Sequence, residues 1–349
     1  MNTKIAIIGS GFGMYCLLPA FSNTKECQVV SICGKNSERM SRFCEKFGVK
    51  QYTNWKEMLQ KVKPDAVAIA VIPKYQFEIA KYALENGISV FAEKPLTTNY
   101  ETSLELSEIA KKYGLANMID FEFPEITEWI DAKDIIKNGK IGKIGKISSV
   151  ELDWVFLSYD LSNNIKSWKT DSEKGGGALS LVFSHVFYYL EYFIGKITSV
   201  RCSLSSSEKS LNNADTTINM TLLFENGCHG NIHVDISDAK KQQHIIKFYG
   251  SDGILKLQNF SNDFVDNFEL ILDKDNESQK ISLNRKLNFL DNENEDPRVK
   301  VVTNLTRKFI TWCNTGVPVK PNFQDGLRVQ KLIEVARTSD LIGTGVVIP

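Results

Sequence analysis

Three glycines stand close together near the amino terminus, directly after the apolar run 5–8. The sequence there is Gly9-Ser10-Gly11-Phe12-Gly13. A strand, a glycine turn and a helix in this order let a pyrophosphate approach the backbone and meet the N–H groups at a helix N-terminus. The third glycine of GxGxxG is missing, because Met14 holds its place, so we expect the helix to pack differently on the strand. The alternative is a turn that only connects strand to helix.

The end of the second apolar run, 29–33, bears on which dinucleotide is bound. It continues Gly34-Lys35-Asn36, without the carboxylate that takes the ribose 2′-hydroxyl in NAD-binding proteins. Lys35, with Arg39 behind it, offers positive charge to a 2′-phosphate. The pattern therefore favours NADP slightly over NAD, although an ordinary surface lysine explains Lys35 equally well.

Two further polar positions follow apolar runs. Glu93-Lys94-Pro95 comes after 89–92, and Glu122 comes just after 115–119. In an open parallel sheet, ligands collect beyond the carboxyl ends of the strands. Pro95 biases Lys94 toward extended backbone. The ammonium can then reach the cleft and stabilise the alkoxide that develops as an alcohol loses a hydride, and Glu122 points toward the same cleft. The alternative for Lys94 is a lysine that ends a strand at the surface.

The elements that must position these residues show in the hydrophobic pattern. Between residues 4 and 120, apolar runs alternate with segments of helical period, as expected for βαβ units and a parallel sheet. The expected strands are 5–8, 29–33, 66–71, 89–92 and 115–119, and the expected helices are 14–21, 37–47, 55–61, 76–86 and 101–113. This α/β pattern predicts a Rossmann dinucleotide-binding domain over residues 1–120.

The pattern changes after residue 120. A helix over 125–138 leads into strands of period two, in which Val150, Leu152 and Trp154 face one way while Glu151 and Asp153 face the other. Further strands are expected at 198–204, 218–224, 230–236, 244–249, 254–257 and 268–272, then a polar stretch over 273–296 and a closing helix from 322. We expect residues 121–349 to form an α+β domain with a mostly antiparallel open sheet. One face would bind substrate and the other would contact a second subunit.

Composition narrows the class of function. The 349 residues carry 42 Lys+Arg and 42 Asp+Glu, and this zero net charge removes the electrostatic argument for a nucleic-acid or membrane partner. The seven cysteines show no metal-ligand spacing. His229 and His233 would lie about 13 Å apart on a strand, too far to share a metal. We expect a cytoplasmic protein without a metal site that acts on a small molecule.

Several motifs together resemble one family over nearly the whole chain. Besides the glycine turn and Glu93-Lys94-Pro95, they are Leu18-Pro19-Ala20-Phe21, Ala70-Val71-Ile72-Pro73, Gly175-Gly176-Gly177-Ala178-Leu179 with His185, and Pro321-Asn322-Phe323. In these positions the chain resembles the Gfo/Idh/MocA oxidoreductases, which include glucose-fructose oxidoreductase and inositol dehydrogenase.

The resemblance implies roles for particular residues. Lys94 would contact substrate and the nicotinamide ribose, and His185 would be the second catalytic residue, as suits a side chain that titrates near neutrality. Trp168, Lys169, Glu122 and His185 would bind substrate. The cofactor site would comprise Gly9, Gly11, Phe12, Gly13, Lys35, Arg39, Val71, Pro73, Gln76, Glu93 and Lys94. Relatives commonly carry aspartate four residues before the histidine. Leu181 stands there, so the proton transfer rests on His185 and Lys94 or on another residue.

The expected function is hydride transfer between NAD(P) and a secondary alcohol of a sugar, sugar nucleotide or cyclitol, by a homo-oligomer such as a dimer or tetramer. Two alternatives stay open. One is an NAD-dependent glycosidase that recycles its bound cofactor. The other is a catalytically silent NAD(P)-binding regulator, which Leu181 and the altered glycine pattern motivate.

Overall fold

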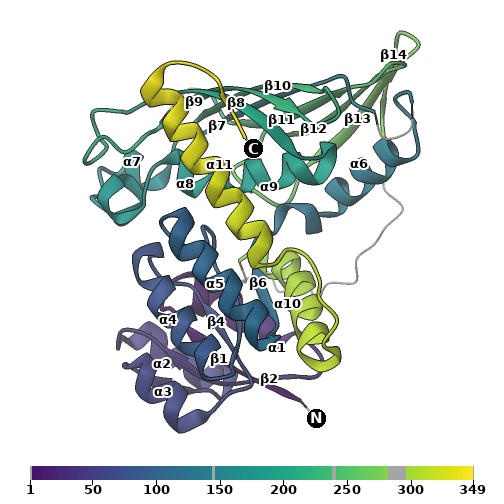
Figure 1. Ribbon diagram of the computed structural model, residues 1–349. Coiled ribbons are helices and arrows are strands. Elements are labelled where there is room, and N and C mark those ends of the chain that lie inside the picture. The colour runs from purple at the N-terminus through teal and green to yellow at the C-terminus, as the bar shows by residue number, and fades with distance from the viewer. Residues whose placement is uncertain (1, 144–145, 238–240, 282–295, 349) are drawn as a thin grey trace. The chain divides into compact units, whose positions relative to one another are not determined.

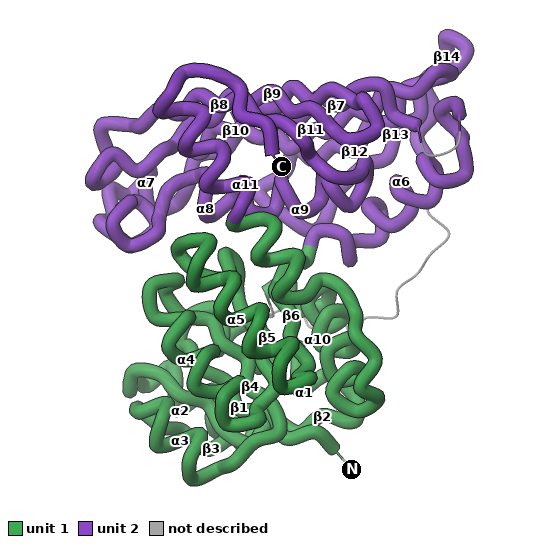
Figure 2. The backbone as a smooth tube through the Cα atoms, viewed as in Figure 1, with its two compact units in different colours: residues 1–122, 289–330 green, residues 123–288, 331–349 purple. Residues whose placement is uncertain are grey.

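The computed structural model describes residues 2–143, 146–237, 241–281 and 296–348. They form two compact units (Figure 2), one of residues 1–122 and 289–330 and one of residues 123–288 and 331–349. The units differ from the predicted division at residue 120, since 289–330 return to the first unit. The reason is α10, Arg298–Thr315, which packs on α1, Leu18–Ser22, and on β1, Thr3–Ile8.

The first unit is built on a parallel sheet with the strand order β3-β2-β1-β4-β5-β6. Its other strands are β2 Cys27–Cys33, β3 Lys50–Tyr52, β4 Ala66–Ile69, β5 Ser89–Ala92 and β6 Asn117–Ile119. This is the order of the Rossmann fold, so the predicted fold is confirmed. Every residue of β4, β5 and β6 is buried, as expected for strands with helices over both faces (Figure 1). The short β3 was not predicted.

The helices of the first unit begin and end at residues that suit those positions. They are α2 Glu38–Phe47, α3 Trp55–Val62, α4 Pro73–Glu85 and α5 Tyr100–Tyr113, besides α1 and α10. Ser37, Asn54 and Asn99 each accept a hydrogen bond from an N–H of the first turn. Gly48 and Gly114 end their helices with positive φ. Helix α11, Phe323–Ile342, begins in the first unit and continues into the second.

The second unit contains a nine-stranded sheet in its described residues, ordered β14-β13-β12-β11-β7-β10-β9-β8-β15. The strands are β7 Ser149–Val155, β8 Ile197–Ser205, β9 Thr217–Phe224, β10 His229–Asp235, β11 Gln243–Tyr249, β12 Ile254–Asn259, β13 Glu269–Lys274, β14 Glu277–Lys280 and β15 Val346–Val347. Neighbours are antiparallel except β7 and β10, which are parallel. The predicted mostly antiparallel sheet is confirmed. Part of the expected polar stretch forms β13 and β14, and residues 282–295 lie outside the described residues.

One face of this sheet packs against helices and the other is polar. The covering helices include α6 Thr127–Lys137 and α9 Phe183–Ile194, and between them and the sheet lies an aromatic core. There the Phe193 ring lies 4.8 Å from Phe248, and Trp154 stacks on His244 at 4.2 Å. The stretch Ser172–Ile194 is long and apolar enough to cross a membrane, but 72% of its apolar window is buried inside this unit.

Shorter helices connect these elements. They are η1 Gly13–Leu17, η2 Phe123–Glu125, α7 Tyr159–Ser162, η3 Trp168–Thr170, η4 Ser172–Lys174 and α8 Ala178–Leu181. Two of them carry residues that the sequence assigned to the site, η1 with Gly13 and η3 with Trp168 and Lys169. The fold therefore places those residues on short helices next to strand ends or glycine turns.

Candidate active site

The glycines of the turn after β1 differ in what surrounds them. Gly9 has φ +140, and a Cβ there would overlap the backbone oxygen of Ala70, which follows β4. A Cβ on Gly11 would meet no atom within 4 Å. Gly9 is therefore needed by the fold itself, whereas Gly11 leaves open space beside the backbone. Open space at the second glycine fits a turn that a pyrophosphate approaches closely.

The helix after the turn begins in an unusual way. Residues Gly13–Leu17 form a π-helix before α1 starts at Leu18, and Met14 is 2% exposed. The sequence predicted an α-helix from residue 14, and the π-helix takes the place of its first turn. Whether helix and strand pack more loosely or differently without the third glycine stays a prediction. The first turn of a helix leaves some N–H groups without intrahelical partners; in this turn Met14 and Tyr15 donate theirs to the Gly11 carbonyl at 2.9 and 3.2 Å.

The tip of β2 lies against the same turn. A Cβ on Gly34 would lie 2.8 Å from the Cβ of Ser10, so the two backbones touch. Lys35 follows directly and is exposed, as is Arg39, whose guanidinium lies 5.8 Å from the Tyr15 ring. The sequence-predicted positive charges thus lie beside the turn, at the strand end where a ribose would be bound.

The ends of β5 and β6 bring acidic side chains together around Lys94. Ala92 pairs with Ile119 in the sheet, so the residues that follow, Glu93 and Asp120, emerge side by side. The N–H of Lys94 donates to the Glu93 carboxylate at 3.2 Å. Asp120 is 1% exposed and was not among the predicted site residues. Its position after an apolar strand, like that of Glu93, was the signal that would have found it.

Burial governs the protonation of this acidic cluster, Glu93, Asp120 and Glu122. Burial, and then the carboxylates of Glu93 and Glu122, raise the pKa of Asp120 well above its usual range. Burial also raises the pKa of Glu122 to about 7, against the opposing effect of the Lys94 ammonium. The pKa of Glu93 is raised by burial in the same way. At neutral pH the cluster therefore holds at least one proton.

Gln76 on α4 holds the segment that carries Lys94. Its Nε2 lies 2.5 Å from the carbonyl oxygen of Glu93 and 3.0 Å from those of Pro95 and Leu96, and the side chain is 1% exposed. Gln76 was predicted to contact the cofactor, which stays a prediction, and its amide nitrogen donates to these three carbonyls. Pro73 begins the same helix, so its missing N–H costs nothing there.

Arg298 approaches the glycine turn from the first residue of α10. Its guanidinium lies 4.8 Å from the Phe12 ring and 5.9 Å from Tyr15, and it donates two hydrogen bonds to Asp296. No helix was predicted over these residues. Val299, Val302 and later apolar residues at helical spacing were the signal that would have predicted α10 and drawn attention to its first residue.

In the second unit, the triple glycine packs tightly against Asp215. Gly177 has φ +104, and a Cβ there would lie 2.5 Å from an Asp215 carboxylate oxygen. The same carboxylate accepts the Leu179 N–H at 2.6 Å. A Cβ on Gly176 would overlap the carbonyl of Trp168. The start of α8 therefore packs closely on the Asp215 carboxylate.

His185 lies on α9, 5% exposed, with its ring 5.1 Å from that of Phe123. Trp168 is half-buried and Lys169 exposed, both on η3. Leu181 ends α8 and α9 begins at Phe183, so positions 181 and 185 lie on separate short helices rather than on one continuous face.

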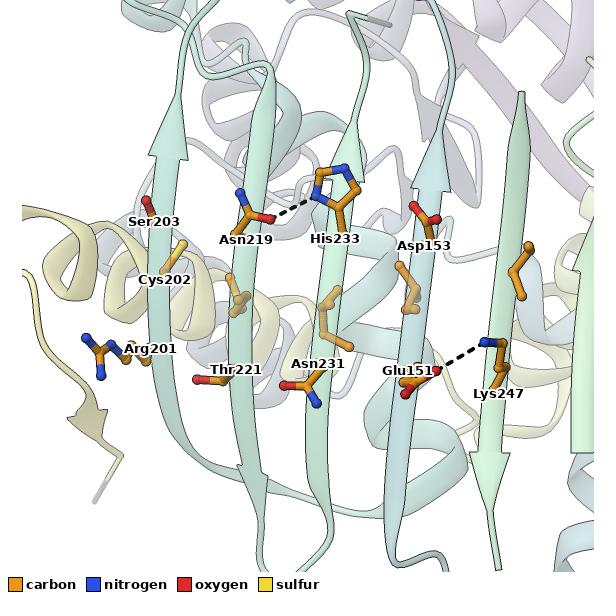
Figure 3. A pocket seen from close by; sticks show the side chains of 14 residues that line it. Glu151, Asp153, Arg201, Cys202, Ser203, Asn219, Thr221, Asn231, His233 and Lys247 are labelled. Carbon is orange, nitrogen blue, oxygen red and sulfur yellow. Dashed lines mark hydrogen bonds and ion pairs between the residues drawn. The ribbon is translucent and has the colours of Figure 1, made fainter. Parts of the chain in front are cut away.

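A hollow of about 680 Å³ lies on the polar face of the second sheet (Figure 3). Side chains from β8, β9, β10, β7 and β11 line it, among them Glu151, Arg201 and Lys247. His233 Nδ1 lies 2.9 Å from the Asn219 amide oxygen, and Lys247 pairs with Glu151 at 3.2 Å. The hollow lies on the sheet face opposite the aromatic core. Asp153 lines the hollow, whereas its neighbour Trp154 points to the other face and packs in the core. In the described residues, no group of three or more His, Cys, Asp or Glu could hold a metal ion.

Two family models match the chain. Residues 3–121 match an oxidoreductase family with an NAD-binding Rossmann fold, and residues 129–256 match the GFO/IDH/MocA C-terminal domain. The chain belongs to the Gfo/Idh/MocA oxidoreductase family. As a member of it, the protein is an NAD(P)-dependent oxidoreductase, and the resemblance drawn from Glu93-Lys94-Pro95 and the glycine segments is confirmed.

Curated relatives of this Gfo/Idh/MocA oxidoreductase include proteins that act on sugars. An uncharacterized oxidoreductase of Synechocystis is 25% identical over 96% of this chain and 93% of its own. Levoglucosan dehydrogenase of Pseudarthrobacter phenanthrenivorans is 28% identical over 67% of this chain and 62% of its own. Among solved structures, levoglucosan dehydrogenase in complex with NADH covers both chains fully, with a TM-score of 0.86 and 20% identity. The aldose-aldose oxidoreductase of Caulobacter crescentus has a TM-score of 0.85 at 17% identity, again over both whole chains.

Proposed function

We propose that this oxidoreductase transfers a hydride between NADP or NAD and a secondary alcohol of a sugar, sugar nucleotide or cyclitol. The observation that carries the proposal is the place of Lys94 at the carboxyl end of β5, two strands from the glycine turn, in a segment whose neighbouring carbonyls Gln76 holds. Curated relatives named for levoglucosan, D-xylose and D-glucosides support the sugar class.

The residues present fit a dinucleotide. Gly11 offers open backbone where a Cβ would otherwise stand, and N–H groups of the following helix start lie beside it. We assign the pyrophosphate to Gly9, Gly11, Phe12 and Gly13, and the adenosine ribose to Lys35 and Arg39, with NADP slightly favoured. Val71, Pro73 and Glu93 would line the cofactor. When bound, the nicotinamide supplies the group that gives or takes the hydride.

Lys94 and His185 are the proposed catalytic residues. The Lys94 ammonium donates a hydrogen bond to the substrate oxygen and stabilises negative charge on it. His185 binds the hydroxyl and is suited to exchange its proton. Trp168 and Lys169 offer an aromatic face and a cation to a polyhydroxylated ring.

The polar face of the second sheet is the proposed subunit contact of a homo-oligomer, a dimer or tetramer. It carries Glu151 and Asp153 beside Arg201 and Lys247, so a second copy could meet it with opposite charges matched. Light scattering of the intact protein, compared with Thr221→Lys in the middle of this face, tests the assignment. A cytoplasmic location stays a prediction.

The test of the function is steady turnover. NAD⁺ or NADP⁺ is mixed with the protein and with levoglucosan, D-xylose and methyl β-D-glucoside in turn, and reduced nucleotide is followed at 340 nm. We expect continuous production with at least one of these sugars, and a loss of about a hundredfold or more in Lys94→Ala. Glycoside cleavage without net nucleotide reduction would identify a recycling glycosidase instead. Nucleotide binding without either reaction would favour a regulator.

A further inference from the structure

Arg298, the first residue of α10, lies against two aromatic rings of the glycine turn. Its guanidinium carbon is 4.8 Å from the centre of the Phe12 ring and 5.9 Å from that of Tyr15. The two rings meet edge to face, with their centres 5.7 Å apart. A cation over an aromatic face at such distances is attracted to it, and more strongly where water is partly excluded. These three side chains therefore form one packed group, the Arg298 cluster.

Asp296 fixes the orientation of the guanidinium. Arg298 Nε donates to Asp296 Oδ1 at 2.8 Å and Nη2 donates to Oδ2 at 2.7 Å, which is a bidentate pair. Oδ1 also accepts the backbone N–H of Arg298 at 3.0 Å, and the Asp296 carbonyl accepts the N–H of Val299 at 2.9 Å. The side chains of the pair are 32% and 17% exposed. The residue that leads into α10 thus also holds the plane of the arginine.

Helix α10 gives the Arg298 cluster a firm base, because it packs on the helix that follows the glycine turn. Val302 and Leu305 are fully buried, in the core that also contains Met14 of η1. Further along, the buried hydroxyls of Thr24 and Thr306 lie 2.6 Å apart. Arg298 therefore meets the turn from an element whose position relative to the turn is set by the core.

Phe12 is the residue of the turn whose backbone the Arg298 cluster restrains. It lies between Gly11 and Gly13, with φ −51 and ψ −38 at the start of the helix. The N–H groups of Met14 and Tyr15 are bonded to the Gly11 carbonyl. Those of Phe12 and Gly13 come before this bonded turn, and groups in that position are the ones that can meet a phosphate. Because ring and N–H share one Cα, a fixed Phe12 ring restrains the direction of its N–H.

We propose that Arg298 is a positioning residue of the dinucleotide site, which holds Phe12 so that the N–H groups of the turn face the pyrophosphate. This inference rests on the proposed function. Arg298 acts through the Phe12 ring rather than as a counter-charge to the phosphates, because Asp296 offsets its charge. NADPH and NADH carry the same pyrophosphate, so the affinity for both depends on this arginine.

The experiment is a double-mutant cycle, read by fluorescence titration of the intact protein with NADPH and with NADH. Arg298→Met keeps much of the side-chain length and removes the charge and the plane. It should weaken the binding of both nucleotides by at least about threefold, as expected for the loss of a partly desolvated cation–π contact. In a Phe12→Ala background the same substitution should cause a loss at least about twofold smaller, because the ring through which Arg298 acts is gone.

Arg307→Met is the matched control on the same helix. Arg307 is exposed, and its Nη1 donates to Asn304 at 3.3 Å. The substitution removes the same charge roughly 14 Å further along the helix axis, where physiological salt largely screens it. Both affinities should stay within about twofold of wild type. Urea unfolding of every variant establishes that the protein is folded under the conditions of the titration.

Asp296→Asn separates positioning from charge by the sign of its effect. It removes a negative charge from the neighbourhood of an anionic ligand, so electrostatic attraction alone would tighten binding. The guanidinium would lose its charged anchor, and we expect both nucleotides to bind about twofold or more weakly instead. This variant keeps Arg298 itself, so it also carries the test if Arg298→Met does not fold.

Three results would overturn the inference. The first is a loss of less than threefold in Arg298→Met. The second is a loss in the Phe12→Ala background within twofold of that in wild type, which would show that Arg298 contacts the phosphates directly. The third is Asp296→Asn binding within twofold of wild type or more tightly. If the wild-type protein binds neither nucleotide, the proposed function itself is refuted.

Discussion

Replacing Gly11 with alanine separates the cofactor role of the turn from its structural role. Gly11 does not have a positive φ, and the new Cβ would meet no atom within 4 Å. The free energy of unfolding should therefore change by no more than about 0.5 kcal/mol. The methyl group would occupy the space that a pyrophosphate needs, and an overlap of this kind costs about 1–3 kcal/mol. At about 1.4 kcal/mol per tenfold, NADPH should bind roughly 5 to 150 times more weakly.

Gly9→Ala should behave in the opposite way. Its φ of +140 is strained for alanine, and its Cβ would overlap the carbonyl of Ala70. We expect a loss of at least about 2 kcal/mol in unfolding free energy. Gly345→Ala is the control, because its Cβ would come no closer than 3.9 Å to a neighbour and it lies in the second unit. Urea unfolding gives the stabilities and fluorescence titration gives the affinities. Tight NADPH binding by a well-folded Gly11→Ala protein would refute the pyrophosphate assignment.

Three further changes test the surrounding residues. Lys35→Asp should weaken NADPH binding by about tenfold and leave NADH binding unchanged, because it reverses the charge beside the 2′-phosphate. The control is Lys25→Asp, just before the start of β2, which should change neither affinity. Gln76→Ala should cost about 2–4 kcal/mol in urea unfolding, since buried carbonyls lose their donor, while exposed Gln60→Ala should cost under about 0.5 kcal/mol. Glu122 has a pKa raised from 4.5 to about 7 in the folded protein, so ionisation opposes folding and wild-type stability should fall between pH 5 and pH 8. Glu122→Gln should remove part of that fall, at least about 1 kcal/mol by thermal and urea unfolding, and an identical fall in both proteins would contradict this cause.

Local sequence patterns were enough to predict most of the Rossmann unit. Its central strands are buried apolar runs, and α2 and α5 carry Ser or Asn at the start and glycine at the end, so these elements signal their own bounds. The three-residue β3 gave no such signal, because Lys50 and Gln51 are polar edge-strand residues. The sequence did not predict the π-helix at Gly13. It indicated only that the helix start is irregular, because Met14 stands where the third glycine is expected.

The site was predictable where one segment carries it and less so where distant segments meet. Lys94 and the glycine turn lie in short motifs. Arg298 comes to Phe12 across more than 280 residues of chain, a contact that periodicity alone does not show. Asp120 follows an apolar strand as Glu93 does, but only the register of β5 with β6 shows that the two residues emerge side by side. Gln76 was assigned from the family pattern, and only its hydrogen bonds reveal that it holds the Lys94 segment.

The most direct test of the account is a fluorescence titration of the intact protein with NADPH and with NADH. The open turn at Gly11 and the nearby Lys35 predict saturable binding of NADPH, NADH or both. Lys94→Ala should bind the same nucleotide more weakly, but still saturably. The absence of saturable binding for both nucleotides up to millimolar concentration would contradict the central claim.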